Sequence, residues 1–261
     1  MLSDNERFIC QACGNCCSKI RGKLAEGERQ FLKEYGYGKM PLINIVPLER
    51  ISFPLWDWEA RRFKGWQKEV DIDAKIRPSR VVFDLESNKT IIVTYYMDYD
   101  RCPLLSEEGK CRIYGKKRAY ICRLFPFQST PLLETGESAE YFGTCPAIKG
   151  IAPDLPEEKS AQIRFLYNAF GDNFLDAVQN DIITEWINKT TIDLWKKHQK
   201  IRPAINYPYE KLLKRIENSQ KTDFTDFLVE KGAYSREGID RLIKRFDNCD
   251  DAREKVASHL R

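Results

Sequence analysis

Cysteine is the residue type in this chain whose spacing points most directly to chemistry. Four cysteines fall within eight residues, at Cys10, Cys13, Cys16 and Cys17. Thiolates are soft ligands, and Gly14 between them allows the backbone to wrap closely around an ion or a cluster. This segment therefore predicts a metal centre with sulfur ligands.

A second set of cysteines lies far along the chain, at Cys102, Cys111, Cys122 and Cys145. The Cys-x2-Cys-x2-Cys spacing of the first segment matches the three-ligand run of bacterial ferredoxins, in which a remote cysteine followed by proline completes the cluster. Two remote cysteines here precede a proline, namely Cys102 and Cys145. The spacing favours an iron–sulfur cluster of the 4Fe-4S type, with zinc as the alternative, because zinc sites also begin with two cysteines at this spacing.

The eight clustered cysteines suffice for two four-thiolate sites or for one larger bridged cluster. Cys16 and Cys17 are adjacent, and neighbouring side chains diverge, so we expect them to serve two metals or one of them to stay unligated. Cys249 lies apart in a polar C-terminal helix and is interpreted as a small buried side chain. A metal site that only holds the fold together is the competing interpretation.

Composition excludes several classes of function. The chain has 261 residues with 9 Cys and only 2 His, which argues against histidine-based hydrolase sites and catalytic triads. Its net charge of +4 does not suggest a dedicated nucleic-acid binder. We see no export signal and no apolar run of the roughly 18 residues that a membrane helix needs. A cytoplasmic protein is expected, in which many cysteines indicate metal binding or redox chemistry.

The elements that must position the cysteines are mixed in the first half of the chain. Residues 81–85 and 90–96 are rich in β-branched and aromatic side chains, and the four residues between them read as the turn of a hairpin. A helix is expected after Pro54, with Trp56, Phe63, Trp66 and Val70 on one face. Residues 131–156 hold four prolines and are expected to form a loop.

The second half reads as successive helices. Apolar side chains recur at helical spacing in three stripes: Ile163, Leu166, Tyr167 and Phe170; Leu175, Val178, Ile182 and Trp186; and Ile239, Leu242, Ile243 and Phe246. Pro156 and the two glutamates after it suit the start of the first helix. The sequence thus predicts an α+β protein, with a cysteine-rich metal-binding domain at residues 1–155 that contains a small β-hairpin, followed by an all-helical region at residues 156–261.

The stretch from Lys110 to Arg123 contains six basic residues and no acidic one. Cations near a cluster lower thiol pKa values and stabilise its negative charge, whereas the alternative is a solvated loop. Phe125 and Phe127 after Cys122 are candidates for an apolar wall that limits solvent access to a cluster. Tyr114 is either a proton donor or a packing residue.

These motifs together resemble a known family. The opening Cys-x2-Cys-Gly-x-Cys-Cys resembles the YkgJ family, whose CxxCxxCC domain chelates zinc or iron, and so do Cys-Pro-Leu-Leu, Cys-x-Ile-Tyr, Cys-Arg-x-Phe-Pro and the late Cys-Pro, over about residues 8–150. The resemblance implies that the metal-binding set is Cys10, Cys13, Cys16, Cys17, Cys102, Cys111, Cys122 and Cys145. The family usually has Arg-Pro before the Cys-Arg pair, whereas Arg118 is followed by Ala119 here and the loop is one residue longer, so we expect it to bulge.

Three functional hypotheses follow. In the first, an iron–sulfur cluster or paired metal centres serve electron transfer, as in an oxidoreductase, or a cluster-dependent modification of a partner protein. In the second, zinc holds the cysteine-rich half rigid and the helical half binds a partner protein without redox activity. The third is a lysine N-methylase-like enzyme, because flagellin lysine N-methylases have a similar cysteine pattern; no glycine-rich loop for S-adenosylmethionine supports it.

Overall fold

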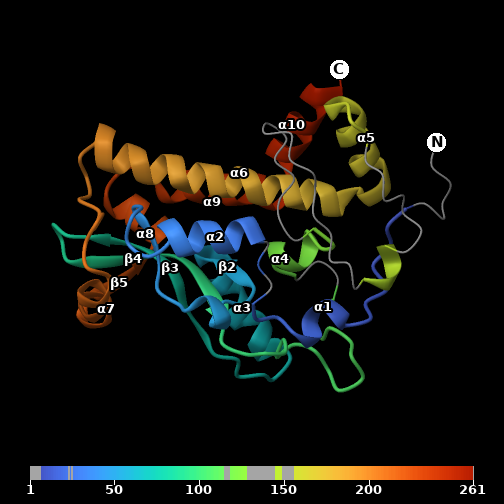
Figure 1. Ribbon diagram of the computed structural model, residues 1–261, viewed down its shortest axis with the longest axis horizontal. Coiled ribbons are helices and arrows are strands. Elements are labelled where there is room, and N and C mark those ends of the chain that lie inside the picture. Colours follow the sequence, from blue (N-terminus) through green and yellow to red (C-terminus); the bar gives the residue numbers. More distant parts are fainter. Residues whose placement is uncertain are drawn as a thin grey trace. The chain divides into compact units, whose positions relative to one another are not determined.

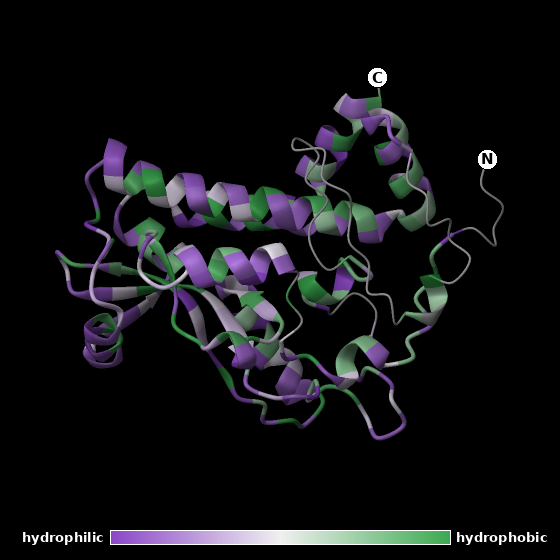
Figure 2. Ribbon diagram, in the orientation of Figure 1, coloured by the Kyte–Doolittle hydropathy of each residue, from purple (hydrophilic) through white to green (hydrophobic). Residues whose placement is uncertain are grey.

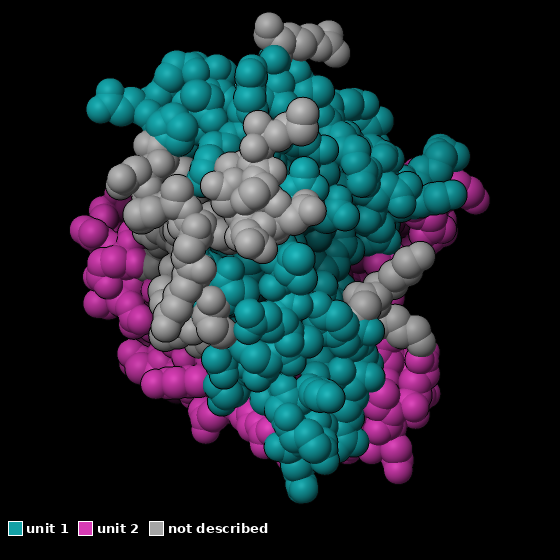
Figure 3. All heavy atoms as spheres, turned by 90° about the vertical axis from the view of Figure 1, so that its right-hand side faces the viewer, with its two compact units in different colours: residues 1–18, 105–185, 241–261 teal, residues 19–104, 186–240 magenta. Residues whose placement is uncertain are grey.

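The computed structural model describes residues 7–22, 24, 26–114, 118–127, 145–148 and 156–260. Figure 1 shows the helices and strands of the chain, which divides into two compact units, each built from separate stretches of sequence (Figure 3). Unit 1 comprises residues 1–18, 105–185 and 241–261, and unit 2 comprises residues 19–104 and 186–240.

Unit 2 contains a five-stranded sheet around a long hairpin. Its strands are β1 (Leu42–Asn44), β2 (Pro54–Trp56), β3 (Ile76–Asp84), β4 (Lys89–Met97) and β5 (Gln220–Asp223). Strands β3 and β4 form the predicted hairpin, with Val82 opposite Ile91. Strand β3 also pairs with β1, and the other edge of β4 pairs antiparallel with β2 and parallel with β5. Extended backbone suits the β-branched residues that fill the hairpin.

The helices of unit 2 cover this sheet. They are α2 (Glu26–Tyr35), the short η2 (Leu48–Arg50), α3 (Asp57–Glu69), η4 (Asp193–Lys197), α7 (Tyr209–Asn218) and α8 (Phe224–Glu230). One apolar cluster packs Leu212 and Ile216 of α7 against Val81 and Phe83 of β3. The predicted helix after Pro54 is α3, which begins one residue after Trp56 and buries Phe63.

Unit 1 is helical and has its own core. Its elements are α1 (Asn15–Ser18), α4 (Tyr120–Arg123), η3 (Pro146–Ile148), α5 (Lys159–Phe170), α10 (Asp250–Leu260) and parts of α6 (Asp172–Ile192) and α9 (Arg236–Asp247). The core joins Phe8, Phe125 and Phe127 to the apolar faces of α5, α6 and α10. Figure 2 shows the alternating hydrophobic and hydrophilic bands of these helices. Residues from both sides of position 155 thus share one core.

The α+β class is confirmed, with a small sheet of mainly antiparallel strands and mostly helices in the C-terminal half. Strand β5 is the one departure from an all-helical second half within the described residues. In the first predicted stripe, Ile163, Leu166 and Phe170 are buried, whereas Tyr167 is exposed. Most of the predicted loop 131–156 lies outside the described residues, so the predicted division at residue 155 stays a prediction. None of the helices described here has the length and apolar character needed to cross a membrane.

Candidate metal centre

The N-terminal cysteine segment turns sharply through two residues with left-handed backbone. Ala12 has φ 49° and Gly14 has φ 76°. The N–H of Cys17 then donates to the carbonyl oxygen of Gly14 at 2.9 Å, where the short helix α1 begins. The Sγ atoms of Cys16 and Cys17 lie 3.6 Å apart. The two adjacent thiols therefore converge, and the divergence expected of neighbouring side chains does not occur here.

Gly14 also lies directly against a second cysteine-bearing loop. A Cβ atom built on Gly14 would be 2.3 Å from the carbonyl oxygen of Gly109 and 2.9 Å from Cδ1 of Leu105. Leu105 and Cys111 close this loop as an antiparallel bridge. Only glycine allows so close an approach of the two backbones. The contact brings Cys111 next to the N-terminal cysteines.

Two further cysteines of unit 1 lie in or directly before short helical elements. Cys122 is in α4, and Cys145 directly precedes η3, whose Ile148 N–H donates to the Cys145 carbonyl oxygen at 3.2 Å. Cys145 is a buried member of the core, and Cys10 and Cys16 pack against the same core. The N-terminal segment and the segments of Cys122 and Cys145 thus place their thiols beside one apolar core.

The thiol of Cys145 belongs with the N-terminal run. Burial raises its pKa, and the neighbouring thiols of Cys13, Cys10 and Cys16 raise it further. Those three residues form the ferredoxin-like Cys-x2-Cys-x2-Cys run. The structure thereby distinguishes Cys145 as the proline-preceding cysteine that adjoins this run in unit 1.

Cys122 and Cys111 form a second, overlapping neighbourhood. Burial raises the pKa of the Cys122 thiol strongly, and the thiols of Cys17, Cys16 and Cys111 add to the effect. Burial likewise raises the pKa of Cys111, with further contributions from Cys16 and Cys10. Cys16 is a neighbour in all three cases, so the seven cysteines form one continuous thiol group.

Two cysteines lie outside this group. Cys102 is buried and belongs to unit 2, whereas the seven thiols of this group belong to unit 1. Cys249 is buried at the start of α10, and burial and then Asp176 raise the pKa of its thiol to about 12. All nine cysteines are among the described residues, and none of them forms a disulfide.

The donor set suits thiophilic metals, although it is not closed around one point. Across the described part of the chain, no three cysteine, histidine, aspartate or glutamate side chains have the arrangement of a finished metal site. The 3.6 Å between the sulfurs of Cys16 and Cys17 is close to the roughly 3.8 Å expected of two thiolates on one tetrahedral zinc with Zn–S bonds of about 2.3 Å. Soft thiolates fit zinc and iron–sulfur clusters, and a metal would have to displace the thiol protons.

The basic stretch has several environments rather than one. Lys110 and Arg112 are exposed, whereas the guanidinium of Arg118 stacks 4.6 Å above the ring of Tyr114. The Tyr114 hydroxyl donates to the carbonyl oxygen of Cys10 at 3.5 Å, and its ring is 47% exposed. Tyr114 and Arg118 therefore flank the thiol group on its solvent side. Lys116 and Lys117, where we expected a bulge, lie outside the described residues.

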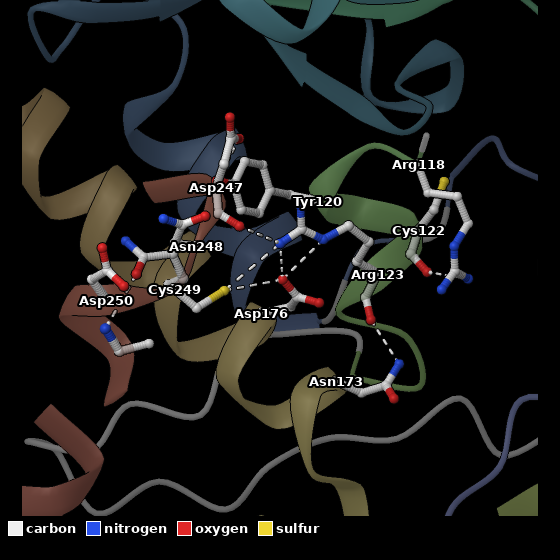
Figure 4. A network of polar contacts seen from close by, with 12 residues as sticks. Arg118, Tyr120, Cys122, Arg123, Asn173, Asp176, Asp247, Asn248, Cys249 and Asp250 are labelled. Carbon is white, nitrogen blue, oxygen red and sulfur yellow. Dashed lines mark hydrogen bonds and ion pairs between the residues drawn. The ribbon is translucent and has the colours of Figure 1, made fainter. Parts of the chain in front are cut away.

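Arg123 is instead part of a largely buried polar network (Figure 4). Its guanidinium forms an ion pair with Asp176 of α6 and stacks 4.6 Å from the ring of Tyr120. Burial disfavours the cation, yet the hydrogen bond with Asp176 and the charge of that carboxylate together outweigh burial and raise the pKa of Arg123. No motif in the sequence singles out Asp176. Its only signal is an acidic residue next to Leu175 on the apolar side of a predicted helix.

Comparison with known proteins bears on the second cysteine set. Residues 64–147 match the family model described as "CxxCxxCC: Putative zinc- or iron-chelating domain". The match contains Cys102, Cys111, Cys122 and Cys145, and begins after the N-terminal cysteine segment. It confirms the resemblance to that domain over about a third of the chain. No curated protein and no solved structure matches the chain.

Proposed function

We propose that the chain, whose residues 64–147 match this metal-chelating domain, holds an iron–sulfur cluster or paired metal centres for redox chemistry or modification of a partner protein. The observation that carries the proposal is the gathering of seven thiols from three chain segments in one unit. Seven thiolates exceed the four that one tetrahedral ion accepts. A centre with more than one metal can bind more of these seven thiolates as ligands.

The neighbourhoods divide the ligands into two sets. The first contains Cys10, Cys13, Cys16 and Cys145, which is a ferredoxin-like run completed by a proline-preceding cysteine. In this proposal the second contains Cys17, Cys111 and Cys122, and the sequence resemblance adds Cys102 to the metal-binding set. Cys102 lies three residues before Leu105, where the chain returns to unit 1.

The chain's own residues perform three tasks in this proposal. Burial and neighbouring thiols raise the pKa values of the Cys111 and Cys122 thiols and so favour their protonated form. These thiols must therefore release their protons when they bind metal. Phe125 and Phe127 line the apolar core on which the cysteine segments lie and exclude water from that side. When bound, an iron–sulfur cluster supplies one-electron redox chemistry, at a potential set by burial and hydrogen bonding.

The solvent side fits an encounter with another macromolecule. Cys13 and Tyr114 are exposed there, with the guanidinium of Arg118 on the Tyr114 ring. We propose a protein partner on this side and do not expect nucleic acid or a membrane. We place the protein in the cytoplasm, where many cysteines indicate metal binding or redox chemistry rather than disulfides.

A zinc-stabilised binding module is the second candidate. The short distance between the sulfurs of Cys16 and Cys17 favours it, because two thiolates on one tetrahedral ion lie about that far apart. In that case the metal would hold the fold and the helices would bind the partner. The lysine N-methylase alternative keeps only its similarity in cysteine pattern.

Anaerobic purification of the full chain, followed by iron, zinc and acid-labile sulfide analysis and a visible spectrum, tests the proposal. Iron with matching sulfide and a broad visible band is expected; zinc without sulfide or colour would replace it with the second candidate. Cys145→Ser and Cys122→Ser should each remove metal from one set only. Cys249→Ser is the matched control, since serine keeps a donor toward Asp176 and Cys249 belongs to neither set.

A further inference from the structure

Helix α4, which carries Cys122, is too short to hold its own position. It spans four residues, Tyr120–Arg123, and isolated helices of this length are unstable in water. What fixes the direction of the Cys122 thiol must therefore come from outside the helix. The contacts that do so lie on both sides of Cys122 along the chain (Figure 4).

The first contacts fix the backbone after Cys122. The side-chain amide of Asn173, at the start of α6, donates to the carbonyl oxygens of Arg123 and Phe125, each at 2.7 Å. Before Cys122, the hydroxyl of Tyr120 donates to Oδ1 of Asp247 at 3.2 Å. Helices α6 and α9 thus each bind one side of α4.

The central contact is the ion pair of Arg123 and Asp176. Nε of Arg123 donates to Oδ1 of Asp176 at 3.0 Å, and Nη2 donates to the same oxygen. Both side chains are largely buried, at 20% and 10% exposed. The thiol of Cys249 donates to this oxygen as well, at 3.3 Å, and lies 3.7 Å from Nη2 of Arg123. Asp176 is therefore surrounded by donors.

Stability alone does not account for such a pair. Removing two charges from water costs nearly as much as their attraction returns, and apolar side chains of similar size often serve stability equally well. What a planar guanidinium with fixed donors provides is a defined orientation. In metal sites, residues outside the ligand set commonly orient the ligands in this way.

We propose that Arg123 is a positioning residue of the metal centre, which fixes the Cys122 thiol through its ion pair with Asp176. The inference rests on the proposed function, because Cys122 is a proposed ligand. Arg123 directly follows Cys122, so a shift of the guanidinium moves the thiol with it. Cys249 supports the pair as a donor and does not serve as a ligand.

The test separates orientation from stability by replacing the pair with apolar residues of similar size. The double variant Arg123→Met with Asp176→Leu should unfold in urea at about the wild-type midpoint. Its affinity for Co²⁺, used as the metal probe on the full chain, should fall about 10- to 100-fold. Leu212→Ala, a core change in α7 of unit 2, is the control and should lose stability with unchanged Co²⁺ affinity. Wild-type Co²⁺ affinity in the double variant would overturn the inference.

A second measurement needs no metal and keeps failure of the two proposals apart. Alkylation of the metal-free protein, followed by mass spectrometry, should show faster modification of Cys122 in the double variant, with Cys145 unchanged. If the wild type binds no metal but Cys122 alone becomes more reactive, the positioning role holds and the proposed function fails. Equal alkylation of Cys122 in variant and wild type would refute the positioning role.

Discussion

The contact between Gly14 and the loop of Gly109 gives the sharpest test of how the thiols are brought together. In the variant Gly14→Ala, the added Cβ would lie 2.3 Å from the Gly109 carbonyl oxygen, where ordinary contacts begin at about 3.4 Å. One backbone must then move by roughly 1 Å, and Cys111 moves with the loop. Gly14 also has φ 76°, which alanine adopts only with strain.

The magnitude follows from these two contributions. The left-handed backbone costs alanine about 1–2 kcal/mol. Forcing an extra methyl group into a packed contact costs typically about 1–3 kcal/mol more. The free energy of unfolding should therefore fall by about 2–5 kcal/mol in Gly14→Ala.

Gly171→Ala is the matched control in the same unit. Gly171 also has a positive φ, of 50°, but nothing lies within 4 Å of a Cβ built there. It should lose only the backbone contribution of about 1–2 kcal/mol. Urea denaturation of the full chain measures both losses, and a Co²⁺ titration measures thiol binding. Gly14→Ala should weaken Co²⁺ binding and Gly171→Ala should not. Equal losses of stability and equal Co²⁺ affinities in the two variants would show that the close approach does not hold the thiols together.

Three further predictions concern charge and protonation. Burial raises the pKa of Asp57 from 3.8 to about 6, so the folded state binds its proton more tightly than the unfolded state does. The free energy of unfolding should therefore fall by about 3 kcal/mol as pH rises from about 4 to 6. Urea denaturation at several pH values should show this fall in the wild type and not in Asp57→Asn. For Asp98, hydrogen bonds and charges from three arginines outweigh burial and lower the pKa of the carboxyl group. Its contribution to the free energy of unfolding is therefore present above about pH 4 and is lost as pH falls further. Asp98→Asn should lower the free energy of unfolding by about 2 kcal/mol at pH 7 and make it depend less on pH in acid. The pKa values of the Cys111, Cys122 and Cys145 thiols are raised, so Zn²⁺ binding at pH 7 should release protons from them. A pH indicator in weak buffer measures this release. A Zn²⁺ titration without proton release would show that these thiols are not ligands.

Local patterns predicted the longest elements of the fold. The hairpin expected at residues 81–85 and 90–96 is observed as β3 and β4, because its β-branched residues suit extended backbone over a long stretch. Strand β5, with the sequence Gln-Lys-Thr-Asp, has no apolar alternation and could not be predicted. It pairs through its backbone with β4, so its side chains need not follow a strand pattern.

The candidate site, too, could be predicted only in part from the sequence. Cysteine type and spacing indicated the candidate ligands, since ligand chemistry is local to each short motif. The partner of the Arg123 guanidinium could not be predicted, because Asp176 lies 53 residues further along the chain and has no motif of its own. The second role of Gly14, as the point of contact with Gly109, depends equally on tertiary structure.

The core of unit 1 changes how the helical half relates to the cysteines. Phe8 lies two residues before Cys10, and Phe125 lies three residues after Cys122; both rings are buried among helices that follow residue 155. The ring of Phe8 is 5.6 Å from that of Phe170 in α5, and the N–H of Phe8 donates to the carbonyl oxygen of Ala169.

The segments of Cys10 and Cys122 are therefore each attached to the helices through an aromatic side chain close to the thiols. A change that loosens α5 would release Phe8 and with it the N-terminal thiols, and metal binding in turn would restrain the segments that Phe8 and Phe125 attach to the core. The helices of unit 1 thus form the apolar core against which the candidate metal centre packs. A partner that binds them would act on the thiols through this shared core, rather than through a separate domain.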